Sequence, residues 1–200
     1  MMITTHIFAG SFLGLVVGER LGLVSLQLVL AGIVGSVVPD LDMLAGTHRR
    51  SLHFPVLGTV TGLVVLGLTA SLPGAVVGTM LCAVGLHAIM DWLGNGKELR
   101  PWERTDDRAT YDHVRGRWWA AKRYVETGST RDLALGVLLA LPLTVWAEGL
   151  VRVAVIAGVG VSVLYGLGLP YLADRIPDTH TTWSGYLAHH RNRLWHRLTG

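Results

Sequence analysis

Residues 74–93 read GAVVGTMLCAVGLHAIMDWL, an apolar run that carries His87 and Asp91 close to its end. A helix needs roughly 20 apolar residues to cross the hydrocarbon core of a bilayer, and this run has that length. An ionisable group inside such a helix costs about 2.5–3.5 kcal/mol unless it has a partner. The run therefore predicts a transmembrane helix with a functional polar pair, because His87 and Asp91 are one helical turn apart and share a face.

The composition extends this interpretation to the whole chain. Of the 200 residues, 50% are hydrophobic and only 16% are Asp, Glu, Lys or Arg, and the mean hydropathy is +0.45. A soluble protein of this size needs a larger charged surface to cover its core. We therefore expect an integral membrane protein. Its basic pI near 9.4 is interpreted through membrane sidedness, and nucleic acid is not an expected partner.

The apolar stretches indicate the architecture, and there are six of them: residues 7–17, 21–38, 55–72, 74–93, 133–150 and 153–173. We predict an all-α fold, a polytopic membrane bundle of about six helices, with glycines at spacing four on faces that pack closely. Residues 1–200 form a single domain in this prediction. Its parts are a four-helix half over 1–93, a cytoplasmic loop over 94–132, a helical hairpin over 133–173 and a basic amphipathic tail over 174–200. The tail is expected to be a helix lying in the membrane interface.

The positive charges indicate an orientation. Short links near Arg20, at residues 71–73 and near Arg152 pair the helices as hairpins that all turn on one side. Of the 17 basic residues, only Arg20 and Arg152 lie on that side. By the positive-inside rule, the opposite side is cytoplasmic. We expect a multi-pass protein of the inner, cytoplasmic membrane, with membrane lipids as partners. The oligomeric state is unknown from the sequence.

Histidines and acids gather at helix ends on the predicted cytoplasmic side. The candidate metal ligands are His6, Asp40, Asp42, His48, His53, His87 and Asp91. Mixed imidazole and carboxylate ligands favour a divalent metal, most readily Zn, with Mn and Fe as alternatives. A metal-bound water loses a proton near neutral pH and can attack a phosphorus or carbonyl centre. We take Asp42, His53 and Asp91 as the candidate catalytic residues.

Three arginines are candidates for substrate binding. Arg49, Arg115 and Arg117 have planar guanidinium groups that can hold a phosphate through paired hydrogen bonds. The alternative for Arg115 and Arg117 is a solvated basic loop near anionic headgroups, and Arg49 can equally be positive-inside charge. The alternative for His87 and Asp91 is a buried hydrogen bond that joins helices. Residues 39–42 can also act only as a helix stop.

The order of these motifs resembles a known family. A histidine near the N-terminus, then PDLD (39–42), HRRSLH (48–53) and HAIMD (87–91), is similar to the membrane-bound metal-dependent hydrolases that include a LexA-binding inner-membrane protein. The segment LRPWERTDDRATYDHVRGRW (99–118) continues the likeness into versions typical of halophilic archaea. The resemblance implies a distant relation to zinc-dependent phospholipase C and the S1/P1 nucleases, which cleave phosphoesters with several metal ions. HRRSLH departs from the HRGxTHS of bacterial members, and the later His-x-x-x-Glu of the soluble enzymes is missing.

Two functions from different classes remain open at this point. The first is a membrane-embedded metal-dependent hydrolase that attacks a phosphoester, for instance a phospholipid headgroup, with metal-activated water. The second is a non-catalytic membrane scaffold with a structural metal, whose basic cytoplasmic loops bind a protein or nucleic-acid partner. A closed coordination shell is expected for the scaffold and an open position for the enzyme.

Overall fold

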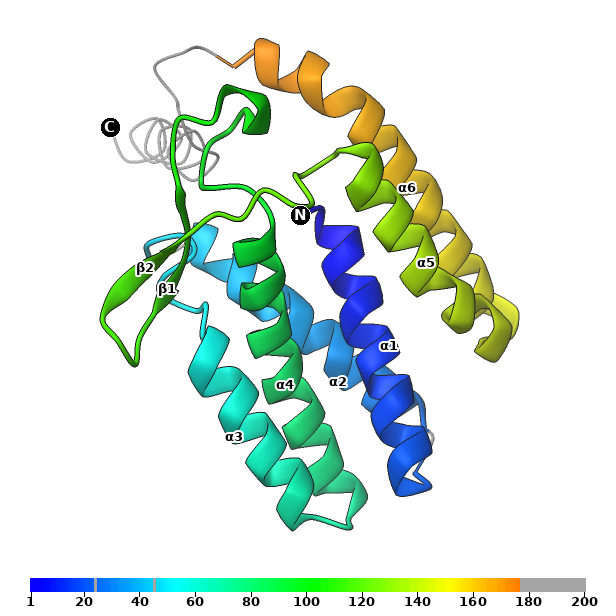
Figure 1. The fold of residues 1–200 in the computed structure, drawn as a ribbon. Coiled ribbons are helices and arrows are strands. Elements are labelled where there is room, and N and C mark those ends of the chain that lie inside the picture. Colours follow the sequence, from blue (N-terminus) through cyan, green and yellow to red (C-terminus); the bar gives the residue numbers. More distant parts are fainter. Residues whose placement is uncertain (24, 45, 177–200) are drawn as a thin grey trace, which may run out of the picture.

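A computed structural model describes residues 1–23, 25–44 and 46–176 of the chain (Figure 1). From residue 177 onward, the predicted amphipathic tail lies outside the described residues. The described part is mainly helical. Its elements are α1 (Ile3–Leu21), α2 (Leu26–Val37), the 3-10 helix η1 (Val38–Met43), α3 (Pro55–Leu68), α4 (Leu72–Leu93), the 3-10 helix η2 (Pro101–Glu103), β1 (Arg108–Asp112), β2 (Arg117–Ala120), α5 (Thr130–Trp146) and α6 (Gly149–Asp174).

Three segments are long and apolar enough to cross a membrane. They are Leu26–Met43, which joins α2 to η1, then Leu72–Leu93 and Gly149–Asp174. Helix α3 is apolar but has only 14 residues, because it ends at Leu68 before the turn that leads to α4. The expectation of about six spanning helices is thus narrowed to three among the described residues. Their presence is compatible with membrane association.

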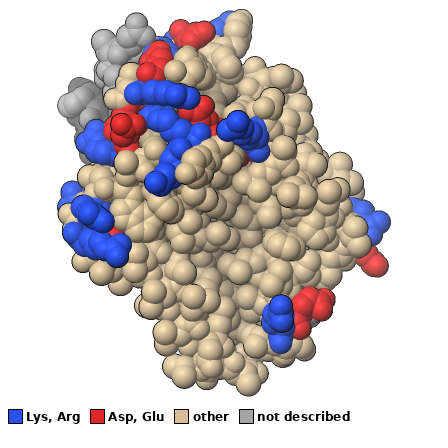
Figure 2. All heavy atoms as spheres, viewed as in Figure 1, with Lys and Arg blue, Asp and Glu red and all other residues tan. Residues whose placement is uncertain are grey.

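Successive helices run in opposite directions through the bundle, so the end of one helix lies beside the start of the next. Helix α4 packs between α2 and α3, and the α5–α6 hairpin packs on α1 (Figure 1). The starts of α1 and α3 and the ends of η1 and α4 all lie at one end, beside residues 94–129. We call this the polar end. In the face that Figure 2 shows, most charged side chains lie near the polar end, and the rest of the surface is largely uncharged.

Glycines allow the tightest helix contacts. A Cβ atom added to Gly32 of α2 would overlap the carbonyl oxygen of Gly10 in α1, and one added to Gly58 of α3 would lie 2.9 Å from the backbone nitrogen of Gly85 in α4. Backbones this close leave no room for side chains between them. The contacts follow the small-residue faces expected for helices packed in a membrane.

A small sheet corrects the all-α expectation. Within the polar stretch 94–132, expected as a loop, β1 and β2 pair antiparallel, with Tyr111 opposite Trp118. Aromatic residues favour such a pleated, half-buried surface. The carboxylate of Asp112 accepts hydrogen bonds from the backbone N–H groups of Val114 (2.9 Å) and Arg115 (3.2 Å) and so holds the turn. Burial opposes ionisation of Asp112, but these bonds keep its pKa below the ordinary value.

The glycine contact between α1 and α2 yields a prediction. Gly32→Ala forces the two helices apart, and such overpacking costs about 1–3 kcal/mol. We expect a lower melting temperature in detergent, measured by the loss of helical circular dichroism. The matched control is Gly67→Ala in α3, where an added Cβ meets no atom within 4 Å. Equal melting temperatures for the two variants would contradict the close contact.

Candidate metal centre

Four separate segments bring their polar side chains together at the polar end. His6 lies in the first turn of α1, and Asp40 and Asp42 lie in η1, which follows α2 directly and has Pro39 as its second residue. His53 precedes α3, whose first residue is Pro55. His87 and Asp91 lie on one face of the last turns of α4.

The core of the site is one group of four residues. Asp40, His53, His87 and Asp91 each offer a ligand atom, and these atoms all lie within 4.8 Å of one another. Asp91 is central: its Oδ2 lies 3.3 Å from Nε2 of His53 and 3.5 Å from Nε2 of His87. Asp40 Oδ1 lies 3.5 Å from the same His87 nitrogen. The structure therefore has a His and Asp group that can hold a metal ion.

His6 adds a fifth side chain to this group. Its Nε2 lies 3.4 Å from Oδ1 of Asp91, and its ring stacks on that of His87 with centroids 3.9 Å apart. His6 is 2% exposed, so its ring nitrogen has no access to water that would replace a protein partner. His6 was among the predicted metal ligands, and the structure places it beside this group of four.

One ring nitrogen of each histidine, Nδ1, already has a hydrogen-bond partner. Nδ1 of His6 lies 2.9 Å from the Met2 carbonyl oxygen, and Nδ1 of His87 lies 2.7 Å from the Ser36 carbonyl oxygen. Because a carbonyl oxygen only accepts, each Nδ1 must carry the proton. In the neutral ring the lone pair is then on Nε2. Nδ1 of His53 likewise faces a carboxylate oxygen, Oδ2 of Asp42, at 3.0 Å.

The other ring nitrogen, Nε2, has no hydrogen-bond partner in any of these three histidines. Nε2 of His6, His53 and His87 are buried and unsatisfied, and all three face Asp91. A neutral imidazole lone pair and a carboxylate oxygen repel each other, so this arrangement favours a positive charge between them, either a proton on Nε2 that pairs with Asp91 or a bound cation. A divalent cation fits that position, and imidazoles fixed through Nδ1 are the usual form of metal-binding histidine.

Asp42 lies behind the group that contains Asp40. Its Oδ1 accepts from Nδ1 of His48 at 2.8 Å and its Oδ2 from Nδ1 of His53 at 3.0 Å, and it is fully buried. These contacts suit a residue that orients histidines. Asp42, His48 and His53 also form a second group whose ligand atoms lie within 4.8 Å of one another. Burial lowers the pKa of His48, against the opposing hydrogen bond to Asp42.

Of the three arginines expected to bind substrate, one lies at the site. Arg49 is buried, and its Nε is 3.5 Å from Oδ2 of Asp91. Its backbone has φ 64°, in the left-handed region that non-glycine residues rarely adopt. The hairpin fixes this position, because the Arg49 carbonyl accepts from the backbone N–H of Tyr111 at 3.0 Å.

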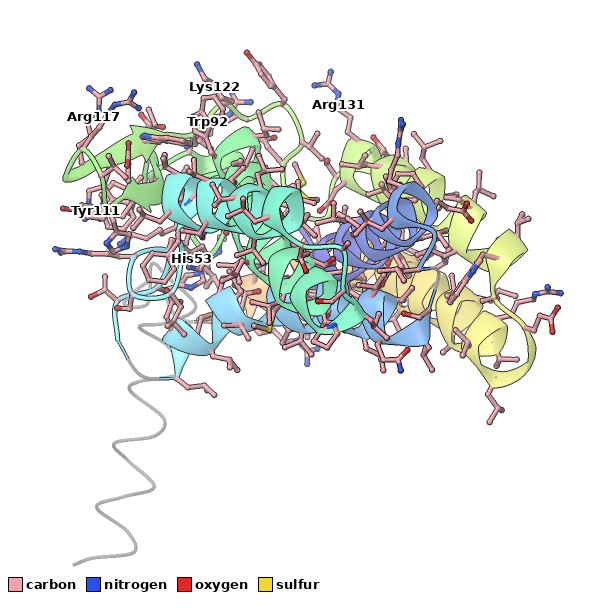
Figure 3. The ribbon with its side chains drawn as sticks, turned by 90° about the horizontal axis from the view of Figure 1, so that it is seen from below. His53, Trp92, Tyr111, Arg117, Lys122 and Arg131 are labelled. Carbon is pink, nitrogen blue, oxygen red and sulfur yellow. The ribbon has the colours of Figure 1, made fainter. Side chains whose placement is uncertain are left out.

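Arg115 and Arg117 lie elsewhere. Both are exposed on the hairpin, and Arg115 pairs with Asp112 across 3.4 Å. Figure 3 shows Arg117 at the outer edge of the molecule, whereas His53 lies among the helices. The two residues line a surface hollow together with Trp92, Trp118, Trp119 and Lys122, and they do not line the cavity beside the metal site.

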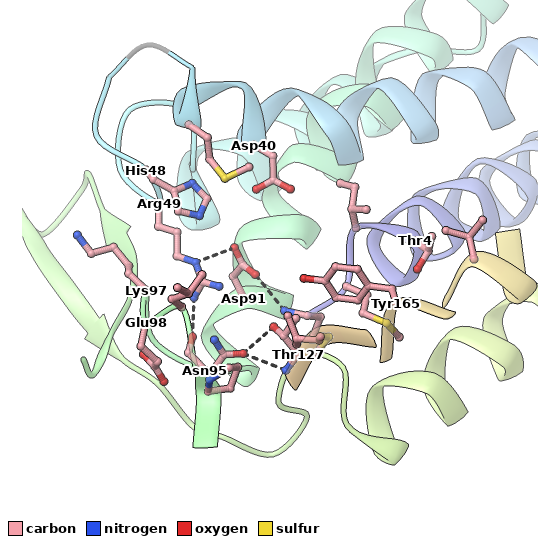
Figure 4. A pocket seen from close by; sticks show the side chains of 18 residues that line it. Thr4, Asp40, His48, Arg49, Asp91, Asn95, Lys97, Glu98, Thr127 and Tyr165 are labelled. Atoms are coloured by element: carbon pink, nitrogen blue, oxygen red, sulfur yellow. Dashed lines mark hydrogen bonds and ion pairs between the residues drawn. The ribbon is translucent and has the colours of Figure 1, made fainter. Parts of the chain in front are cut away.

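A cavity of about 320 Å³ adjoins the carboxylate side of the site (Figure 4). Asp40, His48, Arg49 and Asp91 form one part of its wall, whereas His6, His53 and His87 lie behind that wall. Lys97 and Tyr165 also line the cavity, and neither stood out in the sequence. Burial, with Arg108 nearby, lowers the pKa of Lys97 from its ordinary value.

Asp132 is a buried residue that motif spacing did not single out. Its carboxylate accepts from the backbone N–H of Met2 (2.7 Å) and from the Thr5 hydroxyl (2.7 Å). Met2 in turn receives the Nδ1 hydrogen bond of His6, so Asp132 fixes the start of α1 that orients this ring. Only its position could have marked Asp132 in the sequence, because it lies at the start of an apolar helix, three residues after Ser129. The Ser129 side chain accepts a hydrogen bond from the Asp132 backbone N–H.

Comparison with known proteins adds no assignment: no family model, curated protein or solved structure matches this chain.

The position of Asp132 yields a prediction. Asp132→Asn turns an amide N–H₂ toward donors that need an acceptor, and an unsatisfied buried group costs about 1–3 kcal/mol. We expect a lower melting temperature and weaker metal binding, because His6 loses its fixed orientation. Metal affinity can be measured by competition with a chromogenic chelator.

The same change at Asp107 is the control, because its side chain is 78% exposed and its Arg123 contact lies on the surface. Asp107→Asn should alter neither stability nor metal affinity. Unchanged metal affinity in Asp132→Asn would show that the start of α1 does not depend on this carboxylate.

Proposed function

We propose that this chain is a membrane-embedded, metal-dependent hydrolase that attacks a phosphoester with metal-activated water. The observation that carries the proposal is the set of three unpartnered imidazole nitrogens facing Asp91 beside a cavity. Structural sites close their coordination shell with protein ligands, whereas catalytic sites keep a position for water or substrate. The cavity beside Asp40 and Asp91 therefore supports a catalytic site.

The residues that would hold the metal are the group of four together with His6. Asp40 and Asp91 would contribute carboxylate oxygens, and His6, His53 and His87 would contribute Nε2. This donor set suits Zn, Mn or Fe. When bound, such an ion lowers the pKa of a coordinated water and neutralises negative charge on a phosphoryl oxygen.

Other residues would serve the reaction from the cavity wall. Arg49 would hold a phosphoryl oxygen, because its guanidinium lies beside Asp91 and its Nε has no hydrogen-bond partner. His48 holds its proton on Nδ1 toward Asp42, so its Nε2 is the atom that can take a proton from an attacking water. Asp42 would keep His48 and His53 in this tautomer.

We further propose that the polar end faces the cytoplasm and that the protein resides in the inner membrane. Most basic residues of the chain lie on this side in the sequence, as the positive-inside rule requires. A metal centre at this end would then act at the inner leaflet.

The proposal is tested by metal content and activity together. Untagged protein purified in detergent should contain at least one transition-metal ion per chain by elemental analysis, and it should cleave a chromogenic phosphodiester only when loaded. Asp40→Asn should weaken metal binding by about tenfold or more while the helices stay folded, since its side chain is 24% exposed. His87→Ala should remove binding.

His113→Ala is the matched control, because His113 contacts the Arg50 carbonyl oxygen on the hairpin side and belongs to neither metal group. Protein that binds no transition metal would overturn the proposal. Stoichiometric metal without cleavage of any phosphoester would favour the scaffold instead.

A further inference from the structure

We infer that the substrate of this site is an amphiphile, a phosphoester or phosphonate head carrying an alkyl chain, which reaches the metal centre sideways between η1 and α6. The inference rests on the proposed function and specifies its substrate class. Four features of the cavity carry it: its charged part, its apolar wall, its mouth and its size.

The charged part of the cavity wall fits an anionic head. Arg49 and Lys97 line it, together with Asp40 and Asp91 of the metal group. Glu98 is the third acid on the wall, and its Oε1 is paired with Arg123 at 2.7 Å. With a divalent ion between Asp40 and Asp91, the charge facing the cavity is positive, and a phosphoryl group complements it.

Another part of the cavity wall is apolar. Val161 and Leu169 of α6, with Ile3 of α1 and Met43 of η1, line this part. Tyr165 extends from α6 into the cavity toward Asp91, so its ring separates the apolar wall from the charged part (Figure 4). A water-soluble phosphate would leave this wall in contact with water, whereas an alkyl chain would cover it.

The mouth of the cavity opens on the side of the helix bundle. Ile3 is 42% exposed and Val161 is 55% exposed, so the apolar wall continues to the outer surface. Just beyond, the Ser162 hydroxyl donates to that of Thr4 at 2.7 Å and closes the seam between α1 and α6. Leu41 of η1 and Leu164 of α6 are also exposed, and both lie in segments that are long and apolar enough to cross a membrane.

The size of the cavity fits only part of such a molecule. At about 320 Å³ it is at the small end of ligand pockets, which span about 300–1,000 Å³. It can hold a head group and the first carbons of a chain, and the remainder of the chain would lie against the exposed face of α6. Lateral access therefore explains why α6, although apolar, contributes a tyrosine to a polar site.

The experiment uses a phosphonate, which is not cleaved, and cobalt as a spectroscopic probe. Full-length protein loaded with Co²⁺ in detergent is titrated with methylphosphonate and with dodecylphosphonate, and the visible Co²⁺ absorption reports a head group reaching the metal. Val161→Trp narrows the mouth. It should weaken dodecylphosphonate by about tenfold, the loss of roughly two buried methylene groups, and leave methylphosphonate unchanged.

The control is Val153→Trp, the same change at an exposed α6 residue that does not line the cavity, which should affect neither ligand. Ile3→Trp narrows the mouth from the α1 side and should reproduce the effect of Val161→Trp. Comparing variants with the same ligand removes the effect of detergent partitioning.

The outcomes separate the two proposals. If both mouth variants weaken the two phosphonates equally, or neither of them, lateral binding of a chain is overturned and the hydrolase stands. If Co²⁺ does not bind at all, the metal centre fails and this inference fails with it. If dodecylphosphonate binds as expected but no phosphoester is cleaved, amphiphile binding stands and the hydrolase falls.

Discussion

The structure depends on one electrostatic conflict at the polar end of the bundle. Three buried imidazole nitrogens, Nε2 of His6, His53 and His87, face the carboxylate of Asp91 without a hydrogen bond. In water such groups would each be solvated, but here the neighbours of Asp91 are these rings, Nε of Arg49 at 3.5 Å and the Met1 ammonium at 3.4 Å. A cation resolves the conflict, since lone pairs and carboxylate then become ligands.

The rest of the fold holds these groups in place. The ends of α2 and α4 are tied by the Ser36 carbonyl oxygen, which accepts a hydrogen bond from Nδ1 of His87. The start of α1 is tied by Asp132 through Met2, and the start of α3 by Asp42 through His53. Each tie fixes a ring through Nδ1, which leaves Nε2 as the only nitrogen that can reach the centre. Glycine contacts below let the helices stand close enough for these short side chains to meet.

The sequence could predict the features that depend on residue spacing and on the free-energy cost of placing an ionisable group in an apolar helix. His87 and Asp91 share a helix face, and an ionisable pair in an apolar helix needs a partner, so a site at this end followed from local rules. The different roles of Asp40 and Asp42 could not follow, because they depend on the 3-10 geometry of η1. That turn directs Asp40 to the group of four and Asp42 to His48 and His53. The hairpin was missed because its strands are short and polar, and its aromatic residues suggested only an interfacial belt. Arg49 and Arg117 looked equivalent as basic residues, and only the pairing of β1 with the Arg49 backbone separates them.

The position of the cavity has a consequence for how selectivity can arise. A metal centre with an open side would accept many anions, because a bound ion and Arg49 would interact with any phosphoryl oxygen. Discrimination must then come from surfaces that do not touch the reacting atoms. The apolar wall formed with α6 is such a surface, since covering it adds binding free energy in proportion to the apolar area removed from water. Because Val161 on that wall is exposed, the proposed lateral route would favour molecules that are already dissolved in a bilayer. In that setting a lipid chain loses little by entering the mouth, and the polar head gains the charge that the membrane interior lacks.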